Sequence, residues 1–207
     1  IAPGVAALSP EEIAAVGGAA NTVIALPARG SDRSYHRVLR EQDSVMLVRH
    51  GTERPENDDY AVHARFLEAA GVRACRVLAH EPHQRFTVLE DLGDRHLSDL
   101  VREGDPRATE QAYDATLAVV ARLHACADRA LAAGLTMQKH FGPSLYEWEH
   151  NLFLEQCAVP HLGLPPDQTD AIRAELRTVA DRLCGQPVVL VHRDLQSTNV
   201  LFHRGEP

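Results

Sequence analysis

An acidic and an amide side chain stand five residues apart near the end of the chain, in the run His192-Arg193-Asp194-Leu195-Gln196-Ser197-Thr198-Asn199. An aspartate can accept the proton of an attacking hydroxyl, and the oxygen of an asparagine can hold a divalent cation. Apolar residues at 188–191 and 200–202 flank the run, which predicts a buried strand, a polar loop and a short return strand. One rigid loop would then align a nucleophile and neutralise charge on the group that it attacks.

The spacing H-R-D-x-x-x-x-N is that of kinase catalytic loops, which transfer a phosphoryl group. We therefore expect Asp194 to orient and deprotonate the acceptor hydroxyl, and Asn199 to bind the metal ion. His192 and Arg193 would fix the loop, with His192 as a packing strut. The alternative is a chance match in a polar loop, and the apolar segments on both sides argue against it.

Three further segments match the pattern of one family of small-molecule kinases: 30–38 (GSDRSYHRV), 89–94 (LEDLGD) and 149–153 (EHNLF). Together with the 192–199 loop, they make the chain resemble the aminoglycoside phosphotransferase and choline kinase superfamily over about residues 20–207. Within it, the chain most resembles bacterial cell-wall amino sugar kinases, which phosphorylate N-acetylmuramate and N-acetylglucosamine at the anomeric hydroxyl. The resemblance implies ATP and Mg²⁺ as cofactors and a small-molecule hydroxyl, with an amino sugar favoured, as the acceptor.

The expected fold is α+β, with the two lobes of a protein-kinase-like fold. Residues 1–89 would form the nucleotide-binding lobe, with an antiparallel sheet of strands at 22–26, 35–39, 44–49, 75–79 and 85–89 and a helix over 57–70. Residues 90–94 would be the hinge, and 95–207 a mainly helical, incomplete lobe with helices at 97–101, 106–132, 143–157 and 167–183. Ser9 and Glu12 form a capping box, which predicts a short helix ahead of the first strand.

The turn between the first two strands is the candidate phosphate-binding segment. Its backbone N–H groups, together with Gly30, Ser31 and Ser34, would contact the phosphates of ATP. Only one glycine is present, so the pattern G-x-G-x-x-G is not met, and an ordinary hairpin is the alternative interpretation. The catalytic-loop motif downstream favours the phosphate-binding interpretation.

Arg49 stands at the end of the third strand, where kinases place a lysine that holds the phosphates. A guanidinium binds phosphate well, so Arg49 could take this role. It could equally be a solvent-facing arginine at a strand end. Asp58 or Asp59 could pair with it, although acidic residues at a helix start also suit the helix dipole.

The remaining contacts are assigned by position. Backbone groups of the hinge bind the adenine in the family, which points to Glu90, Asp91 and Leu92. Sugars are often held by an aromatic face and a carboxylate, so Trp148 and Glu149 are candidate acceptor contacts. An amphipathic helix also needs aromatic anchors, which is the alternative role for Trp148.

Composition narrows the class of protein. The net charge of −8 over 207 residues argues against a nucleic-acid partner. No apolar run approaches the roughly 18 residues that span a membrane, and no signal peptide is visible, so we expect a cytoplasmic protein without a membrane partner. The 4 cysteines are widely scattered, which favours reduced thiols over disulfides or a metal site. The oligomeric state is left open.

The resemblance also implies a second metal-binding aspartate shortly after the catalytic loop, and the sequence stops at Pro207 before such a residue. We therefore expect the 207 residues to be a fragment of a longer enzyme and to be inactive alone. An aminoglycoside- or choline-type kinase is the related alternative, although those usually carry Gly where Arg193 stands. A catalytically silent, kinase-like module that binds a nucleotide or a partner is the alternative of another class.

Overall fold

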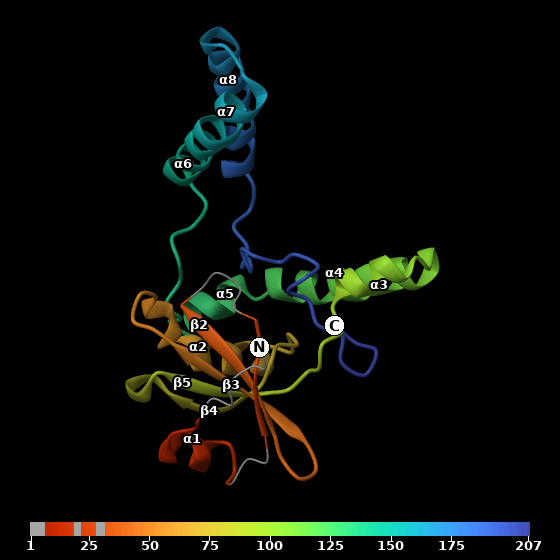
Figure 1. Cartoon of the computed structure of the whole chain (residues 1–207). Helices are drawn as coiled ribbons and strands as arrows, with labels where there is room; N and C mark the ends of the chain where they lie inside the picture. Colours follow the sequence, from red (N-terminus) through yellow and green to blue (C-terminus); the bar gives the residue numbers. More distant parts are fainter. Residues whose placement is uncertain (1–6, 19–21, 28–31) are drawn as a thin grey trace. The chain divides into compact units, whose positions relative to one another are not determined.

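The structure, a computed structural model, describes residues 7–18, 22–27 and 32–207. It contains two compact units (Figure 1). Unit 1 comprises residues 1–135 and 189–207, and unit 2 comprises residues 136–188. This division differs from the boundaries predicted for lobes and hinge, which stay a prediction.

A five-stranded antiparallel sheet forms the centre of unit 1, in the order β1-β2-β3-β5-β4. Its strands are β1 (Thr22–Ala25), β2 (Arg33–Leu39), β3 (Ser44–His50), β4 (Val77–Glu81) and β5 (Phe86–Glu90). Every predicted strand of this sheet is therefore confirmed, with ends shifted by about two residues. Alternation of apolar and polar residues is a local signal, which is why the strand positions could be predicted.

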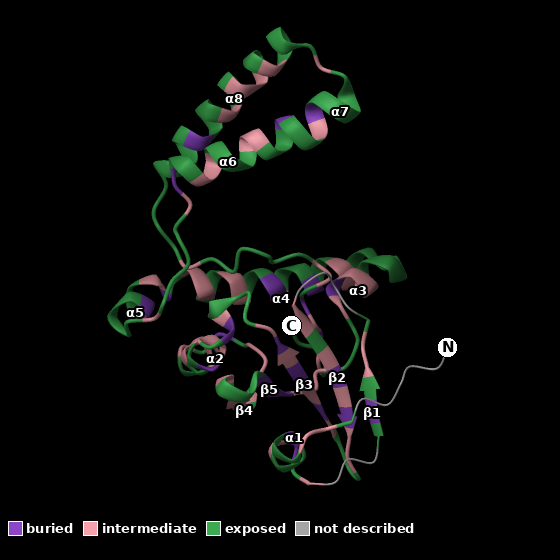
Figure 2. Ribbon diagram, turned by 60° about the vertical axis from the view of Figure 1, so that its left-hand side comes forward, coloured by how far each residue is buried: buried purple, intermediate pink, exposed green. Residues whose placement is uncertain are grey.

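Side chains alternate between the two faces of the sheet, and each face packs against a different helix. Val38, Val45, Leu47 and Val88 lie on one face in a buried cluster that also contains Val16, at the end of helix α1 (Pro10–Ala15). This cluster is the main hydrophobic core of the unit. Figure 2 shows buried residues in purple along the strands of the sheet.

The predicted capping box at the start of α1 is present. The Ser9 hydroxyl accepts a hydrogen bond from the Glu12 N–H at 3.2 Å, and the Glu12 carboxylate accepts one from the Ser9 N–H at 2.8 Å. Both orphan donors at the helix start are thereby satisfied. The carboxylate of Glu12 is buried and faces the sheet, so it is available to a basic residue of β3.

Helix α2 (Tyr60–Ala69) lies on the side of the sheet that carries Thr87. The His80 ring links the two, because one ring nitrogen is 2.8 Å from the Thr87 hydroxyl and the other is 3.0 Å from the Asp58 carbonyl oxygen. A 3-10 turn, η1 (Pro55–Asn57), precedes α2, and another, η2 (Pro82–Gln84), joins β4 to β5. The predicted helix over 57–70 is thus confirmed in a shorter form.

The helices after the hinge are α3 (Leu97–Glu103), α4 (Pro106–His124) and α5 (Ala127–Ala132). The single helix predicted over 106–132 is wrong, because the chain breaks between α4 and α5. The Ala125 and Cys126 N–H groups bond the carbonyls of Ala121 and Leu123, so the turn tightens there. No proline or glycine marks this break, and hydrophobic periodicity alone could not reveal it.

Unit 2 is helical. It contains α6 (Pro143–Phe153), a π-helical turn η3 (Leu154–Ala158), α7 (Val159–Leu162) and α8 (Pro166–Cys184). Arg173 of α8 donates a hydrogen bond to the side-chain oxygen of Asn151 in α6, which joins the two longest helices of this unit. Among the described residues, no helix is long and apolar enough to cross a membrane.

The buried strand predicted at 188–191 is wrong. In the part of the chain that the structure describes, these residues pair with no strand, and Val188 is 77% exposed. The return segment differs, since Val200 and Phe202 are buried and Leu201 forms an isolated antiparallel bridge with His96. The predicted α+β class with its antiparallel sheet is confirmed.

Candidate active site

The 192–199 loop brings its two predicted chemical residues into direct contact. The Asn199 side-chain nitrogen donates a hydrogen bond to one carboxylate oxygen of Asp194 at 2.9 Å and another to the Asp194 carbonyl at 3.0 Å. The Gln196 side-chain nitrogen donates to the other carboxylate oxygen at 3.1 Å. Both oxygens of the exposed Asp194 carboxylate therefore have a fixed donor while their remaining lone pairs face solvent.

The loop is anchored to the protein at its C-terminal side. Val200 and Phe202 pack in a buried cluster with Leu97 of α3 and Ala112 of α4. Leu97 N–H donates to the Val200 carbonyl at 2.9 Å, and Phe202 N–H donates to the Arg95 carbonyl at 2.7 Å. The apolar residues directly after Asn199 thus hold the polar loop against a rigid helical support.

The two residues predicted to fix the loop lie at its exposed N-terminal side. Arg193 adopts a left-handed backbone conformation with φ of 71°, which is uncommon for a residue with a Cβ. Such conformations cluster at functional sites, where the surrounding structure compensates their cost. His192 is exposed, so the role of packing strut predicted for it stays a prediction.

The hinge, residues 90–94, is held from the side of the sheet and from the side of the loop. Glu90 N–H donates to the Arg76 carbonyl at 3.0 Å, and the Glu90 carboxylate pairs with the Arg76 guanidinium at 3.1 Å. The Leu92 carbonyl lies 3.3 Å from a ring nitrogen of His203, just beyond the 192–199 loop. Residues 92–98 and 197–203 therefore run beside each other, and they connect the candidate adenine segment to the candidate catalytic segment.

Asp91 uses its side chain for the structure of the hinge. Its carboxylate accepts hydrogen bonds from Arg37 at 2.6 and 3.0 Å, from the Ser44 hydroxyl at 2.7 Å and from the Gly93 N–H at 3.0 Å. Burial acts to raise the pKa of Asp91, but the hydrogen bonds from Arg37, Ser44 and Gly93 outweigh it, and the pKa is lowered. The carboxylate is therefore a charged, fully bonded anchor, and only the backbone here is available to a nucleotide.

The phosphate-binding turn is described in part. Gly30 and Ser31 lie outside the described residues. Ser34 is exposed on β2, and its hydroxyl is 3.2 Å from a ring nitrogen of His36. Ser34 therefore remains available to a phosphate group, and its role stays a prediction.

Arg49 lies on the face of the sheet opposite to α2. Its guanidinium donates to the two carboxylate oxygens of Glu12 at 2.6 and 2.7 Å and to the Ala7 carbonyl at 2.8 Å. The hydrogen bond with Arg49 lowers the pKa of Glu12. The structure thus shows a structural partner for Arg49 in α1, whereas Asp58 and Asp59 lie at the α2 side.

Trp148 and Glu149 lie on α6 of unit 2, and both side chains are exposed. On the same helix the ring of Tyr146 lies 5.9 Å from Phe141 and 6.4 Å from His150, measured between centroids. These aromatic contacts stabilise the start of α6 and leave Trp148 free of them. The roles of Trp148 and Glu149 as acceptor contacts stay a prediction.

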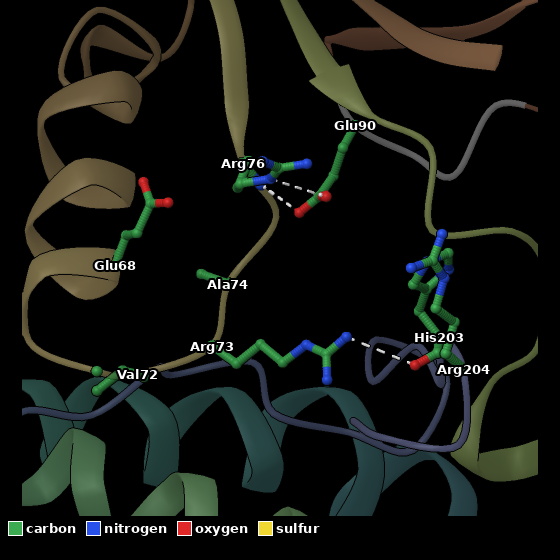
Figure 3. A pocket seen from close by; sticks show the side chains of 9 residues that line it. Glu68, Val72, Arg73, Ala74, Arg76, Glu90, His203 and Arg204 are labelled. Atoms are coloured by element: carbon green, nitrogen blue, oxygen red, sulfur yellow. Dashed lines mark hydrogen bonds and ion pairs between the residues drawn. The ribbon is translucent and has the colours of Figure 1, made fainter. Parts of the chain in front are cut away.

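A cavity of about 470 Å³ borders the hinge at the loop between α2 and β4 (Figure 3). Glu68, Arg73, Arg76, Glu90, His203 and Arg204 line it. Of the predicted site residues, Glu90 alone is among the lining residues that the structure describes. In Figure 3 the guanidinium of Arg76 points to the Glu90 carboxylate, and Arg73 extends across toward His203. The cavity is therefore distinct from the Asp194–Asn199 pair.

The residues of the loop fit a magnesium ion. Magnesium takes oxygen ligands and is usually bound by one or two protein side chains together with substrate phosphates and water. The Asn199 amide nitrogen faces Asp194, which orients the amide and leaves its oxygen as an available ligand beside a carboxylate. Within the described ranges, no group of three or more His, Cys, Asp and Glu residues could hold a metal ion by itself.

Comparison with known protein families identifies the family of the chain. The model of the phosphotransferase enzyme family matches residues 22–207. The chain belongs to this family. A search of curated protein sequences found no match.

Solved structures agree with this family in fold. The streptomycin–ATP ternary complex of the aminoglycoside phosphotransferase APH(2")-IIa matches with a TM-score of 0.55 and 14% identity, over 90% of this chain and 63% of that one. The gentamicin complex of APH(2")-IIa matches with a TM-score of 0.61 and 13% identity, over 97% and 68%. An ethanolamine kinase from Plasmodium vivax matches with a TM-score of 0.51 and 15% identity, over 89% and 54%. The chain thus spans 63% of the first of these proteins.

Sequence reasoning missed two residues that contact the candidate site. Gln196 stands within the motif, and its spacing of two residues from Asp194 could have suggested that the side chains meet. Arg37 reaches the hinge across 54 residues of sequence. In the sequence, Arg37 stands out only as a charged residue in a strand of alternating polar and apolar residues. Its side chain lies on the face of β2 opposite to the core.

Proposed function

We propose that the protein transfers the γ-phosphoryl group of ATP to a hydroxyl of a small molecule, with Mg²⁺. The observation that carries this proposal is the contact between Asn199 and the Asp194 carboxylate in a loop anchored by Val200 and Phe202. Phosphoryl transfer depends mainly on positioning and on stabilising charge, and a pre-oriented carboxylate beside an amide oxygen serves both.

In this proposal Asp194 orients the acceptor hydroxyl and accepts its proton. The amide groups of Gln196 and Asn199 hold the carboxylate, so it need not search for its orientation when the acceptor binds. The oxygen of Asn199 would hold Mg²⁺. When bound, the ion neutralises charge on the phosphate oxygens. His192 and Arg193 would shape the N-terminal side of the loop.

The nucleotide would bind through the hinge and the turn before β2. The backbone at Glu90, Asp91 and Leu92 would contact the adenine, since the Asp91 side chain is fully occupied by Arg37, Ser44 and Gly93. Gly30, Ser31 and Ser34 would contact the phosphates. In this proposal Arg49 has a structural role, because its guanidinium is paired with Glu12.

We favour an amino sugar as the acceptor. The support is the resemblance of the segments at 89–94 and 149–153 to those of the cell-wall amino sugar kinases. Trp148 and Glu149 would contact the sugar, since an exposed aromatic face beside a carboxylate suits a polyhydroxylated ring.

A nucleotide-binding module without catalysis is the second candidate. The observation that favours it is the pairing of Arg49 with Glu12, because Arg49 is the only Lys or Arg in β3. With Arg49 engaged by Glu12, β3 has no other Lys or Arg that could hold the phosphates. Against this candidate, Asp194 and Asn199 keep the residue types of a kinase catalytic loop, and their side chains are in direct contact.

The acceptor is tested by a panel of compounds. Full-length protein with ATP and Mg²⁺ is offered N-acetylglucosamine, N-acetylmuramate, glucosamine, choline and kanamycin, and ADP release is followed for each. The proposal expects acceptor-dependent ADP release with an N-acetylated amino sugar. Release with choline or kanamycin alone would overturn the amino sugar assignment but keep the kinase, whereas nucleotide binding without release would favour the second candidate.

A further inference from the structure

One guanidinium in β2 binds two carboxylates of the hinge. The Arg37 side chain pairs with Asp91 at 2.6 Å and with Asp94 at 2.7 Å. Each carboxylate receives two of its N–H groups, because further bonds of 3.0 Å to Asp91 and 2.8 Å to Asp94 complete the pairs. Paired, parallel hydrogen bonds of this kind fix direction as well as distance. Arg37 therefore holds the hinge at two points separated by Leu92 and Gly93.

The two pairs differ in their surroundings. The side chains of Arg37 and Asp91 are 16% and 5% exposed, while that of Asp94 is 73% exposed. The pair with Asp91 is poorly screened and is also bonded to Ser44 of β3, so it joins two strands and the hinge. The pair with Asp94 is screened by water and contributes less. Loss of Arg37 would leave a buried carboxylate without its main partner.

The position of Arg37 along β2 relates its contact with the hinge to nucleotide binding. Ser34, the described member of the candidate phosphate turn, stands three residues before Arg37 on the same strand. At about 3.3 Å per residue, β2 spans roughly 10 Å between the two. One strand therefore carries both the candidate phosphate contact and the residue that fixes the candidate adenine segment, with the two side chains on opposite faces of the sheet.

We propose that Arg37 is a positioning residue that sets the hinge backbone for nucleotide binding. The proposal rests on the proposed function, because it assigns the hinge to the adenine of ATP. Arg37 itself touches no reacting atom. It holds Asp91 so that the N–H and carbonyl groups of Asp91 and the N–H group of Leu92 are presented in one fixed geometry, while the Leu92 carbonyl is contacted by His203. Removal of Arg37 should weaken nucleotide binding and leave the chemical step unchanged.

The test compares Arg37→Met with Arg40→Met in the full-length protein. Arg40 is a matched control, because it directly follows β2 and is also bonded to a carboxylate, that of Asp43 in the same turn. The dissociation constant for Mg²⁺–ADP is measured by calorimetry, and KM for ATP, KM for the acceptor and kcat are measured by ADP release. We expect Arg37→Met to raise the dissociation constant and KM for ATP by about tenfold, with kcat and KM for the acceptor within about twofold of wild type. Arg40→Met should leave all four values unchanged.

Two further variants complete the test: a conservative substitution of Arg37, and a substitution that removes only its pair with Asp94. Arg37→Lys should recover part of the nucleotide affinity, because an ammonium can pair with one carboxylate but cannot form both paired contacts. Asp94→Asn keeps the Asp91 pair, so it should fold even if Arg37→Met does not, and it should raise the dissociation constant by about twofold to threefold.

The outcomes separate the two proposals. A folded Arg37→Met protein with wild-type nucleotide affinity overturns the role of Arg37 and leaves the kinase untouched. If Arg37→Met does not fold, wild-type nucleotide affinity in Asp94→Asn overturns the role of Arg37. Equal falls in kcat and nucleotide affinity would also contradict a positioning role. A wild-type protein that binds no nucleotide overturns both this inference and the proposed function.

Discussion

The Asn199 side-chain amide lies 2.9 Å from the Asp194 carboxylate, so the candidate metal ligand also orients the candidate base. Gln196 bonds the other carboxylate oxygen at 3.1 Å, on the same short loop. Hydrogen bonds within the loop thus fix the orientation of the carboxylate. Pre-organised groups accelerate a reaction because they need not reorganise when charge develops.

Gln196→Leu removes one of the two donors to the Asp194 carboxylate and keeps a side chain of similar size. We expect kcat to fall by about tenfold, since a carboxylate that is less well oriented presents the acceptor hydroxyl less often. KM for ATP should change little because Gln196 contacts the base and not the hinge. Steady-state kinetics with both substrates varied measure this. An unchanged kcat would show that Asn199 alone orients Asp194.

Phe202→Ala tests the support beneath the loop. Phe202 is buried with Leu97, Ala112 and Val200, and truncation of a buried phenylalanine costs about 3–5 kcal/mol of unfolding free energy. We expect a loss of about 3 kcal/mol, since a rim of the side chain remains accessible, together with lower kcat. Urea unfolding gives the free energy. The exposed Leu195, changed to Ala, is the control and should cost less than about 0.5 kcal/mol.

Arg49→Met separates a structural role from nucleotide binding. The substitution leaves the buried Glu12 carboxylate without its main partner, so we expect the protein to lose about 1–3 kcal/mol of unfolding free energy. The dissociation constant for Mg²⁺–ADP should stay within about twofold of wild type. A large rise in that constant, with stability preserved, would restore Arg49 to the nucleotide site and contradict a purely structural role for its pair with Glu12.

His36 gives the stability a pH dependence. Burial lowers its pKa below 6.5, and the positive charge of Arg49 lowers it further, although Glu12 acts in the opposite direction. The unfolded chain therefore takes up a proton from pH 6.5 downward before the folded protein does, and stability falls as pH drops below that value. Replacing His36 with Gln should reduce the difference in unfolding free energy between pH 8 and pH 5. The exposed His83, changed to Gln, is the comparison variant, and an equal effect of both substitutions would refute the role of His36.

Structural features that depend on residues close together in the sequence were predicted correctly. The strands, the α1 capping box and most helix starts depend on residues within a few positions of one another, so alternation and capping residues were enough to place them. The contact between Asp194 and Asn199 belongs to the same class, because a fixed spacing within one loop brings them together.

Long-range relationships could not be read in this way. Arg49 pairs with Glu12, which is 37 residues away in the sequence, and Arg37 pairs with Asp91, which is 54 residues away. Neither partner follows from local spacing. The apolar run at 188–191 matches a buried strand in composition, yet these residues lie where unit 2 meets unit 1 in the sequence and have no strand partner in the described structure. An apolar run forms a strand only where a second strand pairs with its backbone.

The most direct test of the central claim is ADP release by full-length protein with ATP, Mg²⁺ and N-acetylglucosamine or N-acetylmuramate, compared between wild type and Asp194→Asn. The substitution keeps the size of the side chain and removes its ability to accept a proton. We predict acceptor-dependent release by the wild type, a fall of at least about a hundredfold in Asp194→Asn, and unchanged affinity for Mg²⁺–ADP. Release that persists at the wild-type rate in Asp194→Asn would contradict the proposed mechanism, because phosphoryl transfer would then not depend on the carboxylate that the loop is built to hold.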